Sequence, residues 1–293
     1  MQLDRTQIAI RERGLWELLD LSLRVIARCY KPLLLYTGIG ALPFFLFNWW
    51  ATNWMVADEL SSTTMSRQVF VMAQLVFLEA PLATLLTTIF LGRFMFLQPG
   101  SYRSLLAELW KYSPRIAWTQ LVVRGGAFIF ILAGSLSSDL EMSRAEFLLL
   151  MLCVVSALFR AVRPFVNEII LLEKNPIRSR DPATMTVRRR SAALHRPSRG
   201  ELIPHWLVFA LTAIVLTICL AAGFWFCSGA ISNQWRWNSL MVELFIPLSM
   251  WLVVMFMAVV RFLNYLDLRI RREGWEVELK VRAAANELRG ELV

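Results

Sequence analysis

The chain has 293 residues, of which 57% are hydrophobic and 18% are charged, and its formal net charge is +9. Soluble globular proteins are nearer half apolar and a quarter charged, so this composition is displaced toward membrane proteins. Four cysteines and two histidines are too few for a disulfide scaffold, a zinc site of the usual type or a histidine-rich catalytic centre.

Residues 1–31 are charged throughout, and the segment 14–31 predicts an amphipathic helix outside the apolar core of the membrane. Leu18, Ser22 and Ile26 lie on one side of that helix, at a spacing of four residues. Such a helix can rest in the lipid headgroup layer, or it can pack against the underside of a helix bundle. The sequence leaves both interpretations open.

Long apolar runs predict an all-α, polytopic membrane protein with six transmembrane helices. About 20 apolar residues cross the roughly 30 Å hydrocarbon core at 1.5 Å per residue, and a helix satisfies its own backbone there. We therefore expect residues 1–293 to form one integral-membrane domain with a six-span bundle at 32–263. The six runs cover residues 32–52, 69–92, 116–136, 147–166, 206–231 and 240–263.

Two ionisable residues lie inside predicted spans, Glu79 in the second and Arg124 in the third. Pro81 follows Glu79 by two residues and should kink that helix. Because an unpaired charge in lipid is costly, we expect Glu79 and Arg124 to form a pair facing the bundle interior. The pair can be a structural ion pair or a site for a charged substrate or a proton; a neutral Glu79 is the third possibility.

A polar cluster marks the inner end of the fourth span. Arg160, Arg163, Asn167 and Glu168 lie there within nine residues. Long arginine side chains near a helix end can reach the headgroup layer, and we expect that here. The alternative is a functional site at the inner face.

The segment 167–205 predicts a basic cytoplasmic loop. Asp181–Pro182 is a typical start for a short helix, which would carry Arg188, Arg189 and Arg190. Adjacent arginines next to the inner leaflet can bind phosphate headgroups, at about 1 kcal/mol per charge. The plainer interpretation is a solvated loop.

Lysine and arginine are distributed very unevenly between the two sides of the predicted bundle. The segments 1–31, 93–115, 167–205 and 264–293 hold 24 of the 31 Lys and Arg residues, whereas the other three connecting segments hold one each. This pattern predicts a cell inner-membrane protein with both termini in the cytoplasm. It also makes anionic lipid headgroups the expected contact of the positive charge, rather than nucleic acid.

The tail 264–293 predicts an extension of the sixth helix into the cytoplasm. Its charged residues can pair at a spacing of four along the helix, and Gly274 can end the helix in a left-handed cap. We expect headgroup contacts here or a platform for a protein partner. The residues concerned are Asp267, Arg269, Arg271, Arg272 and Glu273.

Three stretches carry a resemblance: LEAPLATLLTTIFLG at 78–92, RPFVNEIILLEKNP at 163–176 and YLDLRIRREGWEVEL at 265–279. The last resembles the ending of an uncharacterised bacterial family of multi-pass proteins. That family is similar to the membrane domain of some glycerophosphoryl diester phosphodiesterases. Since the phosphodiesterase barrel is absent from this chain, the resemblance implies membrane-domain architecture and does not imply hydrolysis. The pattern is carried by Tyr265, Asp267, Arg269, Arg271, Arg272, Glu273 and Gly274.

The function predicted from these features is that of a non-enzymatic scaffold, anchor or accessory subunit for a protein partner. No nucleotide-binding, zinc-protease or serine-hydrolase motif is present, and we expect no cofactor and no metal. One alternative is a small-molecule or lipid transporter that uses the Glu79/Arg124 region. A cavity reaching Glu79 would favour it, whereas a dry interior would count against it. A second is a lipid-headgroup enzyme at the inner face that uses Asn167 and Glu168.

Overall fold

The computed structural model consists of helices and connecting loops, and no strand occurs among the residues that it describes. Those residues are 12–57, 62–96, 101–123, 126–136, 143–181, 184–235 and 237–274.

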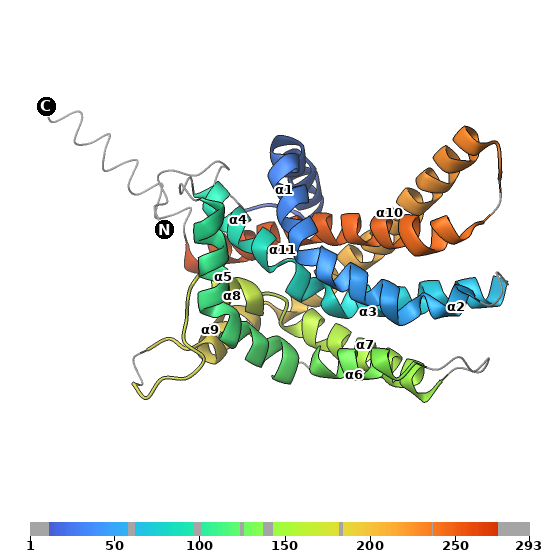
Figure 1. The fold of residues 1–293 in the computed structure, drawn as a ribbon. Coiled ribbons are helices and arrows are strands. Elements are labelled where there is room, and N and C mark those ends of the chain that lie inside the picture. The colour runs from blue at the N-terminus through green and yellow to red at the C-terminus, as the bar shows by residue number, and fades with distance from the viewer. Residues whose placement is uncertain are drawn as a thin grey trace, which may run out of the picture.

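Thirteen helical elements occur within the described ranges, and two of them, η1 and η2, are π-helical. In Figure 1 the second part of α1 together with α3, α7 and α11 runs lengthwise, whereas α5 lies across one end. The elements are α1 (Leu15–Thr52), α2 (Trp54–Ala57), α3 (Ser62–Ala83), α4 (Leu85–Met95), α5 (Tyr102–Ala117), η1 (Trp118–Val123), α6 (Gly126–Gly134), α7 (Arg144–Val162), α8 (Val166–Leu171), α9 (Val187–His195), α10 (Arg199–Ser232), η2 (Met241–Phe245) and α11 (Ile246–Glu273).

Four helices are long and apolar enough to cross a membrane: α1, α7, α10 and the continuous helix Met241–Glu273. The pair α3 and α4 would make a fifth span, although it is bent by 43°. The prediction of an all-α chain with several membrane-spanning helices is confirmed in this form, but six spans are not. The third predicted run, 116–136, falls on the end of α5, on η1 and on α6, which has only nine residues.

The predicted amphipathic segment 14–31 is the first part of α1, which bends at Cys29 (φ −131°, ψ 34°), just before Pro32. Figure 1 shows this part lying across α11. Leu18 and Val25 are buried in a cluster with Leu91 of α4 and other residues of α4 and α11. Of the two interpretations left open by the sequence, contact with the bundle is the one that the structure supports.

The arginine-bearing helix of the basic loop begins later than the sequence suggested. Thr186 is the N-cap of α9, and its hydroxyl accepts from the backbone N–H of Arg189 at 3.4 Å. Asp181 instead accepts a hydrogen bond from the Thr184 hydroxyl at 2.9 Å and so stabilises a turn. Thr and Asp both suit an N-cap. Asp181 is engaged in the turn with Thr184, and the helix begins after Thr186. Pro182 lies outside the described residues.

The end of α11 agrees with the sequence. Gly274 has φ 64°, the left-handed conformation of a C-cap. Two ion pairs at a spacing of four residues precede it, Asp267–Arg271 at 2.9 Å and Arg269–Glu273 at 2.6 Å. The predicted extension of the last helix is therefore present.

The second part of α1 approaches α3 very closely at the end of α3. A Cβ atom added at Gly40 would overlap the backbone carbonyl of Ala83, whereas one added at Gly38 would meet no atom within 4 Å. Glycine is thus required at position 40 by the contact between two backbones, which cannot move aside as a flexible side chain can.

Gly40→Ala should destabilise the protein by about 1–3 kcal/mol, because the added methyl group forces α1 and α3 apart. Gly38→Ala is the matched control and should leave the melting temperature unchanged or slightly higher, since alanine favours the helix. The measurement is thermal unfolding of the detergent-solubilised proteins. Equal melting temperatures for the two variants would contradict this helix contact.

Glu108 fastens α5 to α4 and to the segment after α8. Its carboxylate lies 2.6 Å from Nη2 of Arg93 and 2.8 Å from Nζ of Lys174. Burial alone would raise the pKa of Glu108, but the hydrogen bonds and positive charges of Lys174 and Arg93 outweigh it and hold this pKa below its ordinary value of 4.5. The ionised form is therefore the one that stabilises the fold.

This contribution should be complete well above pH 4.5 and should disappear as the pH falls through the lowered pKa of Glu108. We expect Glu108→Gln to lower the melting temperature at neutral pH and to match the wild type in acid. The exposed Glu12 provides the control, because Glu12→Gln should change nothing at either pH. A Glu108→Gln deficit that stays constant as the pH falls would contradict the assignment.

Candidate functional site

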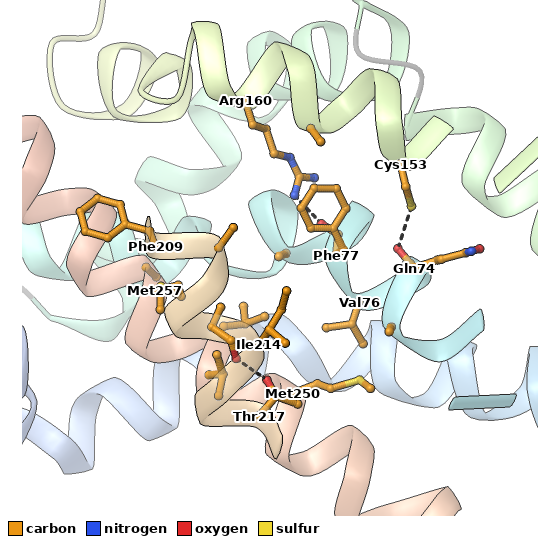
Figure 2. Close-up of a pocket in the computed structure, with 18 of the residues that line it drawn as sticks. Gln74, Val76, Phe77, Cys153, Arg160, Phe209, Ile214, Thr217, Met250 and Met257 are labelled. Carbon is orange, nitrogen blue, oxygen red and sulfur yellow. Dashed lines mark hydrogen bonds between the residues drawn. The ribbon is translucent and has the colours of Figure 1, made fainter. Parts of the chain in front are cut away.

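A large cavity of about 1010 Å³ lies between α3, α7, α10 and α11. Its lining is almost entirely aliphatic and aromatic along most of its length, with a few polar groups. On α11 the lining runs from Ile246 to Asn264, and these 18 residue steps correspond to about 27 Å of helix. The cavity is thus nearly as long as the hydrocarbon core of a bilayer is thick, about 30 Å. Figure 2 shows part of its wall, including Phe209, Met250 and Met257.

Of the helices that line this cavity, α10 is the least buried. Leu202 and Gly229 are buried, but no residue of α10 between them is. Ile214 and Ile218 line the cavity although 57% and 63% of their surfaces are exposed. The cavity therefore opens on the apolar surface beside α10, where a bilayer would lie.

Both ends of α10 are fixed by specific contacts. At the inner end, Arg271 forms an ion pair with Glu201 at 2.8 Å, and Arg272 donates to the Ser198 hydroxyl at 2.9 Å. At the outer end, the Trp235 ring packs edge-on against Trp225 at 5.6 Å between centroids. Between these ends the described residues of α10 pack against α11 and α7 through apolar side chains alone, and the helix borders the cavity without filling it.

The opposite wall, α3, contains a helix break that polar side chains repair. Pro81 has no N–H, so the carbonyl of Phe77 loses its usual helical donor. Arg160 of α7 reaches across, as Figure 2 shows, and donates to the carbonyl oxygens of Phe77 at 2.5 Å and of Leu78 at 3.0 Å. Its guanidinium also lies over the Phe77 ring, 4.1 Å from the centroid.

Asn167 of α8 repairs the next part of the same break. Its Nδ2 donates to the Pro81 carbonyl at 2.9 Å, and its Oδ1 accepts from Gln120. Two residues of the predicted inner-face cluster, Arg160 and Asn167, therefore hold the bend between α3 and α4. Arg163 lies exposed just after α7, and its backbone N–H bonds to the Phe159 carbonyl.

A double-mutant cycle tests this repair. Arg160→Met should destabilise the protein by about 2–4 kcal/mol, because two buried carbonyls lose their charged donor. In a Pro81→Ala background the same substitution should cost at least about 1 kcal/mol less, since alanine at position 81 supplies an N–H for Phe77. Thermal unfolding of the four proteins gives the coupling. Strictly additive effects would contradict the assigned role of Arg160.

The fourth member of the predicted cluster, Glu168, is fully buried and pairs with Arg261 of α11. Nε of Arg261 lies 2.6 Å from Oε1 of Glu168, and Nη2 contacts the Thr84 and Thr88 hydroxyls at 3.3 and 3.5 Å. Arg261 lines the inner end of the cavity beside Asn264. This ion pair gives the cavity a polar end.

Sequence reasoning missed Arg261 and Asn264 as site residues. They lie three residues apart at the end of an apolar run, so they share one helix face, and this spacing was a usable signal. The partner of Arg261 could not be found in this way, because Glu168 is 93 residues earlier in the chain.

The intramembrane Glu79 lies on α3 but does not line the cavity. It is fully buried, and its Oε2 accepts a hydrogen bond from Nδ2 of Asn48 of α1 at 2.7 Å. Arg124 lies outside the described residues, so the Glu79–Arg124 pair stays a prediction. Asn48 was not singled out from the sequence.

The residues expected to contact headgroups or a partner divide into two sets. Arg188 and Arg189 are exposed on α9, and Nη1 of Arg189 donates to the nearby Thr184 carbonyl at 3.4 Å. The others bond to residues distant in the chain or within α11, mainly around the half-buried Glu173, which accepts from Arg190 and from the Tyr265 hydroxyl at 2.7 Å. The internally bonded set is Arg190 with Glu173 and Glu273, Asp267 with Arg13 and Arg271, Arg269 with Glu273, Arg271 with Glu201, and Arg272 with Ser198.

Comparisons with protein-family models, with curated proteins and with solved structures found no match for this chain. The resemblance to the membrane domain of phosphodiesterases therefore stays a prediction. Within the described ranges, no group of three or more His, Cys, Asp or Glu residues is placed to hold a metal ion.

Proposed function

We propose that this protein is a non-enzymatic membrane protein that binds an amphipathic lipid in the cavity between α3, α7, α10 and α11. The observation that carries the proposal is the shape and chemistry of the cavity, which is apolar over a bilayer-like length and polar at one end. A lipid has the same distribution, with long apolar chains attached to a polar head. Lipid binding is a part of the lipid-transporter alternative described above. The site, however, lies on the face of α3 opposite Glu79.

The size and lining of the cavity favour a lipid over water or a small polar solute. At about 1010 Å³ it reaches the upper limit of small-molecule sites, roughly 300–1,000 Å³. Apolar walls bind water poorly, and an empty space forfeits the dispersion contacts of its lining. Each methylene group buried there contributes about 0.8 kcal/mol, so an acyl chain is a favourable occupant.

The distribution of Lys and Arg supports a place in the bacterial inner membrane, with the α5, α8 and α9 end in the cytoplasm. Arg93, Arg115, Arg190 and Arg269 all lie on elements at this end of the described structure. An even number of membrane crossings would put both termini on the cytoplasmic side, as the arginine distribution requires. The lipid head would then lie at the inner leaflet.

The scaffold or anchor role expected from the sequence also remains a proposal, with one observation in its favour. Arg188 and Arg189 are exposed on α9 and can contact anionic headgroups or a cytoplasmic partner. Such a role is compatible with lipid binding, because these two residues do not line the cavity.

Filling the cavity tests the proposed function. Ala213 of α10 lines the cavity, whereas Val215 on the same helix is 49% exposed and does not. Ala213→Trp should bind lipid at least about tenfold more weakly, because the indole displaces two or more methylene groups at about 0.8 kcal/mol each. Val215→Trp adds the same ring toward the bilayer and should bind like the wild type.

Lipid binding can be measured by native mass spectrometry of the detergent-solubilised proteins during titration with phospholipid. Thermal unfolding verifies that both variants are folded. Equal binding by wild type, Ala213→Trp and Val215→Trp would place any bound lipid elsewhere and would overturn the proposal.

A further inference from the structure

A buried carboxylic acid on α3 belongs to neither the cavity nor the lipid site proposed above. Glu79 is fully buried and does not line the cavity. Its neighbours one turn away on the same face of α3, Leu75, Val76 and Ala83, are buried and apolar. Oε2 of Glu79 accepts a hydrogen bond from Asn48, and no described residue bonds to Oε1. The carboxyl group therefore has no cationic partner within the described part of the chain.

An ionised carboxylate is costly to bury in such surroundings. Taking an isolated carboxylate out of water costs far more free energy than one hydrogen bond from a neutral donor returns. A buried carboxyl group with no cation beside it instead becomes neutral by taking up a proton. Among the described residues, Glu79 meets this condition.

Two unused acceptor atoms lie on the two side chains of the Asn48–Glu79 contact. Nδ2 of Asn48 donates to Oε2 of Glu79 at 2.7 Å. The other oxygen of each group, Oε1 of Glu79 and Oδ1 of Asn48, is buried and has no hydrogen-bond partner among the described residues. An ionised carboxylate has no donor, so these two oxygens cannot bond to each other in that form. Two unsatisfied buried acceptors would then remain, which is unfavourable.

We propose that Glu79 and Asn48 form a proton-binding site, in which Glu79 carries a proton on Oε1 and donates it in a hydrogen bond to Oδ1 of Asn48. The proton is taken up from the solvent as the chain folds, and it satisfies both unused acceptors at once. With the bond from Nδ2 it closes the ring of two hydrogen bonds that a carboxylic acid and a primary amide form. The site fastens the second part of α1 to α3. It does not rest on lipid binding, because neither residue lines the cavity.

The other ionisable side chains on the elements that contact α3 are bonded to other groups, packed among rings or exposed. Those of α1 before and just after its bend are exposed, apart from Cys29, which donates to the Val25 carbonyl, and Arg144 of α7 is exposed as well. The remainder are Arg67 with Glu146, Cys153 with the Gln74 carbonyl, Arg160 with the Phe77 and Leu78 carbonyls, Arg93 with Glu108, Glu243 with Trp49, Arg261 with Glu168, Tyr265 with Glu173, the charged residues of α11 from Asp267 onward described above, and Tyr36 against Phe90.

Arg124, which lies outside the described residues, is the partner that the sequence suggested for Glu79. An ion pair between them would keep Glu79 ionised and would leave no proton at the site. The two arrangements are exclusive, and they predict opposite effects of pH on stability.

The direction of the pH effect follows from where the extra proton is held. A glutamate in the unfolded chain ionises at about pH 4.3, so above this pH the folded protein with a neutral Glu79 holds one proton more than the unfolded chain. The fold then loses stability as the pH rises, by up to about tenfold in the unfolding equilibrium constant per pH unit, until Glu79 ionises in the fold. With an ion pair the folded protein holds fewer protons, and stability rises with pH instead.

Infrared difference spectroscopy of the full-length protein in lipid vesicles tests the proton directly. At neutral pH, the spectrum of the wild type minus that of Glu79→Gln should contain the C=O band of a protonated carboxyl group. The control is Glu12→Gln, which removes an exposed glutamate and should remove carboxylate bands only. Carboxylate bands in the Glu79 difference spectrum, without the C=O band of an acid, would overturn the proposal.

An exchange of the two groups tests the pairing. The double variant Asn48→Asp/Glu79→Gln puts the acid on α1 and the amide on α3, with side chains of unchanged length. It can form the same ring of two hydrogen bonds, so it should fold and should regain the protonated carboxyl band that Glu79→Gln lacks. An exchange variant that folds without this band, or that does not fold, would contradict the pairing.

Thermal unfolding of the detergent-solubilised proteins gives a second and independent result. Glutamine at position 79 donates to Asn48 and accepts from it without a proton, so Glu79→Gln should fold. Its melting temperature should gain on that of the wild type as the pH rises from about 5 to about 8, whereas Glu12→Gln should follow the wild type. A Glu79→Gln protein that falls further below the wild type as the pH rises, or that fails to fold, would favour the ion pair and overturn the proton site.

Discussion

The structure depends on one constraint, that every backbone carbonyl within the membrane must find a donor inside the protein. Pro81 breaks this rule for α3 by removing an N–H, and the bend at Thr84 exposes further carbonyls. Arg160 and Asn167 supply the missing donors from α7 and α8. Three helices are thereby fixed to one another by charged and polar bonds that are strong in a medium of low dielectric constant.

The cavity lies where the described residues form no such polar bonds between helices. Along the middle of α10, no polar bond to a described residue of another helix holds it against α3 or α7, and hydrocarbon side chains alone gain little by meeting each other when lipid is equally apolar. The helix therefore stays apart from α3 and leaves a lined space. At the inner end the same space meets Arg261, which is held by the buried Glu168. Arg160 and Asn167 hold the α3 wall in place, whereas no polar bond among the described residues holds the middle of α10. The result is a cavity with apolar walls and a polar inner end.

Much of this architecture could be predicted from the sequence, and the parts that could not share a physical reason. Apolar run length located α1, α7, α10 and α11, and Pro81 indicated the bend, because these are local properties of the chain. The pairs Asn48–Glu79 and Glu168–Arg261 join residues 31 and 93 positions apart, and only the way helices pack determines which polar groups meet. The same limit applies to the run 116–136, where composition indicated a span but the described helices are short or π-helical. Likewise, aspartate is the stronger N-cap type, so residue type alone favoured Asp181, whereas the helix begins at Val187 and Thr186 caps it.

Among the described residues, the ion pair and the side-chain hydrogen bond that join α10 to α11 lie at its inner end, and this has a kinetic consequence. The inner contacts of α10, Arg271–Glu201 and Arg272–Ser198, lie just before Leu202, the first residue of α10 that lines the cavity. If a lipid binds in the cavity as proposed, it can enter from the surrounding leaflet without breaking either of these two contacts. The residence time of the bound lipid would then depend on the length of its hydrocarbon chain and on the contacts of its headgroup.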